Sequence, residues 1–126
     1  THHAPRRLPP PRPAHSPHRT ACDPRQNAYK FNQPLSWDTS RVEDMLWMFG
    51  GAYEFNQPLS WDTSGVTSMF RMFQDARAFN QSLSWDTSRV KNMDRIFLDA
   101  NSLSATNKLR IRCAWAGTRA FASAGY

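Results

Sequence analysis

The chain has 126 residues, of which 21% are charged and 40% hydrophobic, and a formal net charge of +6. That length fits one domain and leaves little room for a second. No uninterrupted apolar stretch approaches the roughly 20 residues that a membrane helix needs, and no signal-peptide pattern opens the chain. We therefore expect neither a membrane span nor an intact secretory signal. The first residue is a threonine, which suggests a processed or excerpted segment.

The basic character of the chain belongs to its two ends. Residues 1–21 hold six of the nine prolines, all four histidines and four arginines, without one acid. Residues 105–126 hold four bases and no acid, whereas residues 22–104 carry eight bases against ten acids. We expect residues 1–21 to be a disordered basic tail. Nucleic-acid binding is unlikely except through this tail and the C-terminal end, because the centre offers no continuous positive stripe.

The centre of the chain repeats every 24 residues. Three full copies cover residues 31–54, 55–78 and 79–102, and each adjacent pair agrees at 15 of 24 positions. A divergent fourth copy begins at Leu103. A period of this length is typical of a solenoid, whose short units bury their apolar faces by stacking on copies of themselves. The repeats predict a solenoid over residues 22–104 and a C-terminal cap over residues 105–126.

Each copy predicts a short strand followed by a short helix. Leu35 and Trp37 alternate with a serine, which is the period-two pattern of a strand. The apolar residues from Val42 to Ala52 fall at spacings of three and four, which predicts one face of a helix. Asp38 and the two hydroxyl residues after it are suited to capping the start of that helix.

The recurring motif FNQ-L-S-WDTS-V-M-MF-A resembles the leucine-rich repeats of the BspA-like bacterial surface-protein type, particularly the variant common in mycoplasma lipoproteins. The resemblance covers residues 28–104. It implies an α/β fold, a right-handed leucine-rich-repeat-like solenoid of strand-turn-helix coils in which equivalent residues stack. The right-handed sense is also the one that crossovers between parallel strands prefer. The resemblance further implies a cell-surface or extracellular location and a role in adhesion.

Four columns of large apolar residues recur in the copies and are predicted to form structural ladders. The columns are Phe31, Phe55 and Phe79; Trp37, Trp61 and Trp85; Met45, Met69 and Met93; and Phe49, Phe73 and Phe97. The tryptophan column has an alternative interpretation as a stacking platform for sugars or bases, but its recurrence beside a leucine column favours the core. The Asn-Gln pair near the start of each copy is expected to bond backbone groups where the coil bends.

No catalytic set or metal site is predicted. One aspartate per copy, Asp38, Asp62 or Asp86, stands beside two hydroxyls, which favours helix capping over calcium coordination. All four histidines lie in residues 1–21 without a cysteine or an acid at a zinc spacing, and the repeats contain no histidine to act as a base. Gly50 and its neighbour indicate a helix end and no phosphate loop. We therefore predict a protein that is not an enzyme and holds no cofactor.

The two cysteines, Cys22 and Cys113, are expected to be free thiols. They flank the predicted array, so at least three coils separate them along the stack. A disulfide spans no more than about 7 Å between α-carbons, and the predicted stack would hold the two cysteines farther apart.

The positions that differ among the copies mark the predicted outer surface. Trp47, Phe70, Arg71 and Arg95 are the large side chains among them, and together they could form a partner site. Trp47 could instead fold over a neighbouring coil. The leading hypothesis is an adhesin-like module that binds a protein or cell-surface ligand. The alternatives are nucleic-acid or acidic-polymer binding through the basic ends, and a structural array that associates end to end.

Overall fold

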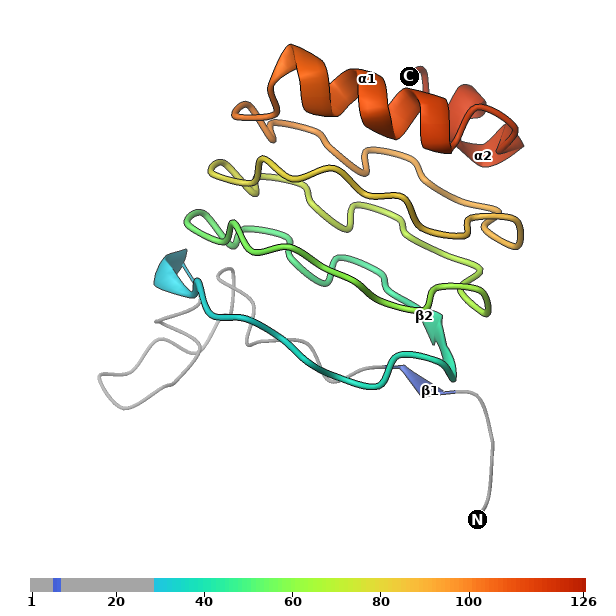
Figure 1. Cartoon of the computed structure of the whole chain (residues 1–126), viewed down its shortest axis with the longest axis horizontal. Helices are drawn as coiled ribbons and strands as arrows, with labels where there is room; N and C mark the ends of the chain where they lie inside the picture. Colours follow the sequence, from blue (N-terminus) through green and yellow to red (C-terminus); the bar gives the residue numbers. More distant parts are fainter. Residues whose placement is uncertain (1–5, 8–28) are drawn as a thin grey trace.

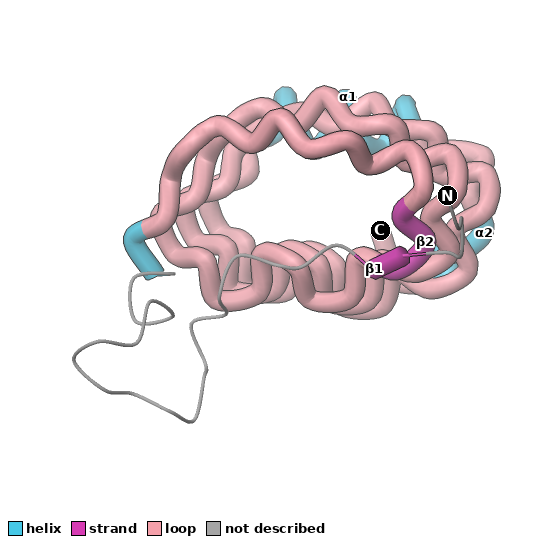
Figure 2. The backbone as a smooth tube through the Cα atoms, turned by 90° about the horizontal axis from the view of Figure 1, so that it is seen from below, coloured by secondary structure: helices cyan, strands magenta, loops and turns pink. Residues whose placement is uncertain are grey.

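The computed structural model describes residues 6–7 and 29–126, and it shows a chain wound into stacked coils (Figure 1). The helices and strands in chain order are β1 (Arg6–Arg7), β2 (Val42–Asp44), α1 (Ala105–Ala114) and α2 (Arg119–Ser123). Viewed along the stack, the coils superpose into one elongated ring (Figure 2). The two α-helices follow the last coil and cover its end.

Backbone hydrogen bonds join each coil to the next in a fixed register. The Phe49 amide donates to the Met72 carbonyl at 2.8 Å, and the Phe73 amide repeats this bond to Ile96 at 2.8 Å. The same bond, from one residue to the residue 23 positions ahead, is made by the amides of Met45, Trp47, Gly51, Met69, Arg71 and Asp75. In this part of each copy, every second backbone amide therefore donates its hydrogen bond to the next coil.

The helix predicted between residues 42 and 52 does not form. After the three residues of β2, the chain makes successive turns in which the amides of Met48, Gly50 and Ala52 each donate to the carbonyl three residues earlier. The intervening amides donate to the next coil, so the i to i−4 ladder of an α-helix has no donors left. A row of turns also places apolar side chains inward every three or four residues, which explains why the spacing indicated a helix.

Two positions in each coil have a left-handed backbone, which a right-handed helix cannot accommodate. Trp47, Arg71 and Arg95 occupy one of these columns with φ of 53°, 56° and 56°. Gly51 begins the other column with φ 73°, and Asp75 and Asp99 follow at 61°. Turns of this kind need positive φ at their third residue. In the first column this conformation is imposed on bulky side chains that rarely adopt it.

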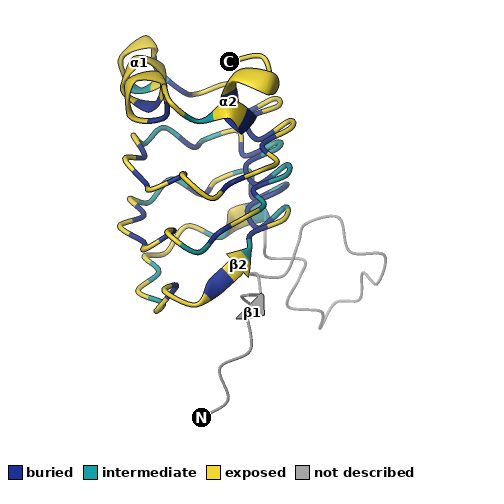
Figure 3. Ribbon diagram, turned by 90° about the vertical axis from the view of Figure 1, so that its right-hand side faces the viewer, coloured by how far each residue is buried: buried dark blue, intermediate teal, exposed yellow. Residues whose placement is uncertain are grey.

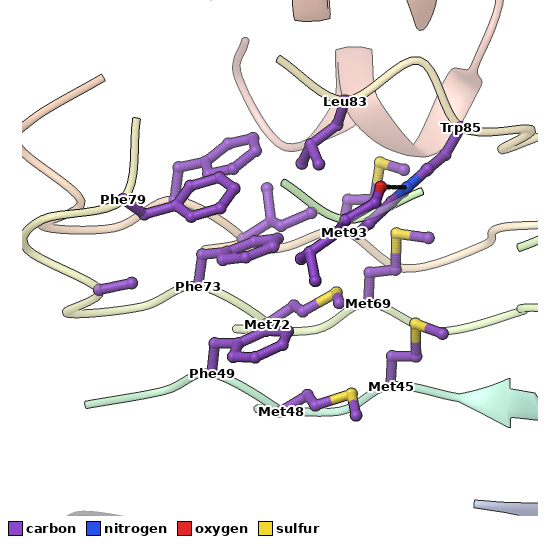
Figure 4. Close-up of a cluster of buried hydrophobic side chains, with 14 of the residues drawn as sticks. Met45, Met48, Phe49, Met69, Met72, Phe73, Phe79, Leu83, Trp85 and Met93 are labelled. Atoms are coloured by element: carbon purple, nitrogen blue, oxygen red, sulfur yellow. Dashed lines mark hydrogen bonds between the residues drawn. The ribbon is translucent and has the colours of Figure 1, made fainter. Parts of the chain in front are cut away.

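The structure places the four predicted ladders inside the coils, in register. The phenyl rings of Phe49 and Phe73 lie 5.4 Å apart and those of Phe73 and Phe97 lie 5.6 Å apart, measured between centroids. The other aromatic columns have successive centroid distances of 5.8 and 6.2 Å for Phe31, Phe55 and Phe79, and 6.1 and 6.1 Å for Trp37, Trp61 and Trp85. Met45, Met69 and Met93 are buried and lie one above another (Figure 4).

Polar ladders accompany the apolar ones. Asn56 Oδ1 accepts hydrogen bonds from the Asn80 amide at 2.8 Å and from Gln81 Nε2 at 3.0 Å. Asn32 accepts the equivalent bonds one coil earlier. The hydroxyl of the buried Thr63 donates to the Asp86 carbonyl at 2.9 Å. These side chains satisfy backbone groups where the coil bends, so the interior contains few orphaned polar atoms.

The segment 105–126 closes the stack with residues that differ from the repeat. Trp115 is fully buried, and its ring continues two ladders, with centroids 6.3 Å from Trp85 and 6.1 Å from Phe97. The Asn107 side chain donates to Asn80 Oδ1 at 2.9 Å and so continues the amide ladder. The outer faces of both helices are exposed (Figure 3).

The other end of the stack is met by β1, which pairs in parallel with β2. Arg6 pairs with Val42, and Arg7 pairs with Asp44. These two residues lie within segment 1–21, for which the sequence predicts a disordered tail. The rest of residues 1–21 lies outside the described residues.

Candidate interaction surface

Three of the four predicted partner-binding residues meet on the outside of the stack. The guanidinium carbon of Arg71 lies 4.9 Å from the centroid of the Phe70 ring and 6.0 Å from that of the Trp47 ring. All three side chains are half-buried. We call Trp47, Phe70 and Arg71 the variable cluster, because they belong to two columns whose residues are not the same in all three copies.

The Trp47 side chain folds back over its own turn. A Cβ added at Gly50 would overlap Trp47 Cδ1, so only glycine leaves room for the indole there. Arg71, which belongs to the next coil, also packs against the indole ring. Trp47 is therefore a flat, partly covered wall of the variable cluster and does not project freely into solvent.

Arg71 contributes a cation that is held mainly by aromatic rings. Its Nε atom is buried and has no hydrogen-bond partner among the described residues. A guanidinium over aromatic faces is stabilised by about 0.5–1 kcal/mol at exposed sites and by more when desolvated. The arrangement fixes a positive charge between two apolar surfaces, which suits a partner with a carboxylate beside an apolar group.

The fourth predicted residue, Arg95, stands apart from the cluster. It shares the column and the left-handed backbone of Arg71, but it is exposed and belongs to the following coil. Leu46, which was not chosen from the sequence, is 41% exposed and shares the column of Phe70. Sequence variation at that column was the signal that could have identified Leu46 as part of the apolar surface.

The aspartate column forms a different exposed row. Oδ1 of Asp62 accepts hydrogen bonds from the Ser64 hydroxyl at 2.6 Å and from the Ser64 amide at 3.0 Å. These bonds, the hydroxyl first, lower the pKa of Asp62, while the charges of Asp86 and Asp38 oppose the shift. Because no helix follows, these carboxylates close local turns and do not cap helices as predicted.

The described residues contain no group of three histidine, cysteine, aspartate or glutamate side chains that could hold a metal ion. In the same part of the chain, no helix is long and apolar enough to cross a membrane. Cys113 is an exposed free thiol on α1. Cys22 and the histidines lie outside the described residues, so the predicted separation of the two thiols stays a prediction.

Comparison with protein families matches residues 24–112 to the family described as "Mycoplasma protein of unknown function, DUF285". The match covers well over half of the chain, and this protein belongs to that family. Neither the curated proteins nor the solved structures include a significant match.

Proposed function

We propose that the chain is a solenoid module that binds a protein or cell-surface ligand, with the variable cluster as its contact site and no catalytic role. In this proposal the coils form a right-handed solenoid of the BspA-like leucine-rich-repeat type, displayed at a cell surface. The observation that carries the proposal is the contact of Arg71 with Phe70 and Trp47, which come from the two variable columns of neighbouring coils.

The division between fixed and variable columns supports this role. Most columns that fill the interior keep one residue type. The variable cluster instead brings together two aromatic rings and an arginine, the residue types that dominate binding energy at interfaces. Leu46 extends the apolar part of the surface.

The second candidate is binding of an acidic polymer by the cap. Lys108, Arg110, Arg112 and Arg119 are all exposed, and residues 105–126 contain no acid. Such binding would weaken steeply with salt, because each neutralised charge on the polymer releases a counterion.

The test measures binding of the full chain to a panel of extracellular-matrix glycoproteins, to double-stranded DNA and to heparin by surface plasmon resonance. We expect binding to one glycoprotein, reduced at least about tenfold by Phe70→Ala or Arg71→Gln. Arg77→Gln is the matched control, because Arg77 also packs on an aromatic ring, 4.1 Å from the centroid of Tyr53, outside the variable cluster.

Equal loss with the control variant would contradict a specific role for the cluster. Binding only to DNA or heparin, abolished by removing the basic residues of the cap or residues 1–21, would favour the electrostatic alternative. Concentration-dependent sedimentation without any ligand binding would favour the self-associating array. Melting temperatures of all variants are measured in parallel, so that loss of binding is separated from loss of fold.

A further inference from the structure

We propose that the gap between the last coil and the cap is a binding site for a small aromatic carboxylate. The gap is a cavity of about 330 Å³ between residues 97–103 and the two cap helices. This volume lies at the lower end of the range of small-molecule sites, which are mostly apolar with a few converging polar groups. The inference does not depend on the interaction function proposed above.

The repeat is broken at one position that lines the cavity. In the first two coils a phenyl ring of one column packs against a phenyl ring of the next copy, with centroids 4.4 Å apart for Phe49 and Phe55 and 4.3 Å for Phe73 and Phe79. The equivalent partner of Phe97 is Leu103. A leucine fills less space than a ring, and the helices above do not close the gap. A flat aromatic ligand would lie against Leu103 inside this cavity, next to the position where the earlier coils have a second ring.

The far wall of the cavity is also aromatic. The ring of Tyr126 stacks on Phe121 with centroids 5.3 Å apart and meets Phe97 edge-on at 6.0 Å. The hydroxyl of Tyr126 accepts a hydrogen bond from the Phe97 amide at 3.3 Å, which takes the place of the carbonyl that a further coil would supply. This contact fixes the tyrosine ring as a wall of the site.

Two cations stand at the rim and select for an anion. Lys108 and Arg112 line the cavity from α1, and because they are four residues apart they share one face of the helix. Both are exposed, and residues 105–126 contain no acidic side chain. A carboxylate attached to the ring would reach these charges while the ring stays inside. Arg110 lies on the same helix and does not line the cavity.

The probe is 2-naphthoate, with the neutral 2-naphthamide as its matched ligand, both titrated calorimetrically into the full chain. We expect saturable binding of 2-naphthoate and binding of 2-naphthamide at least about tenfold weaker, because the charge-assisted contacts to the cations are lost. Lys108→Gln combined with Arg112→Gln should remove that preference, whereas Arg110→Gln should leave it within about twofold.

Leu103→Phe tests the cavity itself, because it restores the ring found in the earlier coils. We expect this variant to lose 2-naphthoate binding and to melt at a higher temperature than the wild-type chain. Absence of 2-naphthoate binding to the wild-type chain, equal affinity for both ligands, or an effect of Arg110→Gln as large as that of the double variant would each overturn the proposal. Binding unchanged in a folded Leu103→Phe chain would also overturn it.

Discussion

The coils and the cap bury the same columns by different means. In the coils, nearly every buried column holds one residue type repeated every 24 residues, so one geometry serves every layer. In the cap, Trp115 alone extends both the tryptophan and the phenylalanine ladders, and Asn107 supplies the amide contact from a helix. The comparison indicates that the coils fill these columns by repetition, whereas the cap continues them with residues of other types. Each prediction below compares a coil residue with its counterpart in the cap.

The largest expected effect comes from Phe73→Ala. Phe73 is fully buried and contacts the rings of Phe49, Phe79, Phe97 and Trp85. Truncating a buried phenylalanine costs about 3–5 kcal/mol where the surroundings cannot collapse. Phe121→Ala in the cap should lower the free energy of unfolding less, because the short helix α2 can move into the space. Urea denaturation followed by tryptophan fluorescence measures both, and a larger loss for Phe121→Ala would reverse the comparison.

The next largest loss of stability is expected from substitutions in the ladder of asparagine side chains. Asn56→Ala removes the acceptor for both the Asn80 amide and Gln81 Nε2, which should cost about 1–3 kcal/mol because donors are left unsatisfied. Asn107→Ala removes only donors to Asn80, so the cost should be nearer about 1 kcal/mol. The denaturant midpoints of the two variants, compared at an unchanged m-value, show which substitution lowers the free energy of unfolding more. Equal losses would show that the cap is bonded as fully as a coil.

Two tryptophan substitutions give a smaller contrast. The indole Nε1 of Trp85 donates to the Leu59 carbonyl at 2.9 Å, whereas Trp115 Nε1 is buried without an acceptor among the described residues. Trp85→Phe should therefore lose about 1 kcal/mol beyond its packing change, and Trp115→Phe should be correspondingly milder. Thermal unfolding followed by circular dichroism checks this. A Trp115→Phe variant that is the less stable of the two would contradict the account.

The smallest expected effect is a dependence of stability on acidic pH, which the aspartates of the coils carry. The pKa values of Asp38, Asp62 and Asp86 are lowered chiefly by the neighbouring serine hydroxyls, then by the serine amides. A lowered pKa in the folded chain means that the stabilisation is present above the unfolded pKa and is lost as the pH falls through the folded value.

Carbon-detected NMR titration should place all three pKa values below the ordinary 3.8. Ser64→Ala should move the Asp62 pKa back toward that value. Because residues 105–126 contain no carboxylate side chain, cap amides such as that of Asn107 should shift little over the same pH range. An Asp62 pKa at the ordinary value in the wild-type chain would contradict the hydrogen bonds from Ser64 to the Asp62 carboxylate.

Periodicity predicted the columns because stacking of equal coils is a property of the repeat itself. The prediction of a helix between residues 42 and 52 is wrong because an α-helix and a row of turns place apolar side chains at the same spacing. The inter-coil bonds, such as that from the Trp47 amide to the Phe70 carbonyl, distinguish them, and those bonds join residues far apart in sequence. Trp47 was identified as a variable residue, but its fold over Gly50 depends on a positive φ that no side-chain pattern reveals.

The site at the cap was beyond sequence analysis for a related reason. Leu103 was visible as the start of a divergent copy, yet the cavity depends on how the helices sit above it. Tyr126 and Lys108 belong to no repeat, so no column predicted their position. The basic charge of residues 105–126 was the only sequence signal that pointed to this end of the chain.

The register of the coils is the central claim, and NMR coupling across hydrogen bonds measures it directly. We predict couplings from the Phe49 amide nitrogen to the Met72 carbonyl carbon and from the Phe73 amide nitrogen to the Ile96 carbonyl carbon, each a step of 23 residues. Couplings from these amides to carbonyls four residues earlier would show an α-helix in each repeat and would contradict the stack of turns described above.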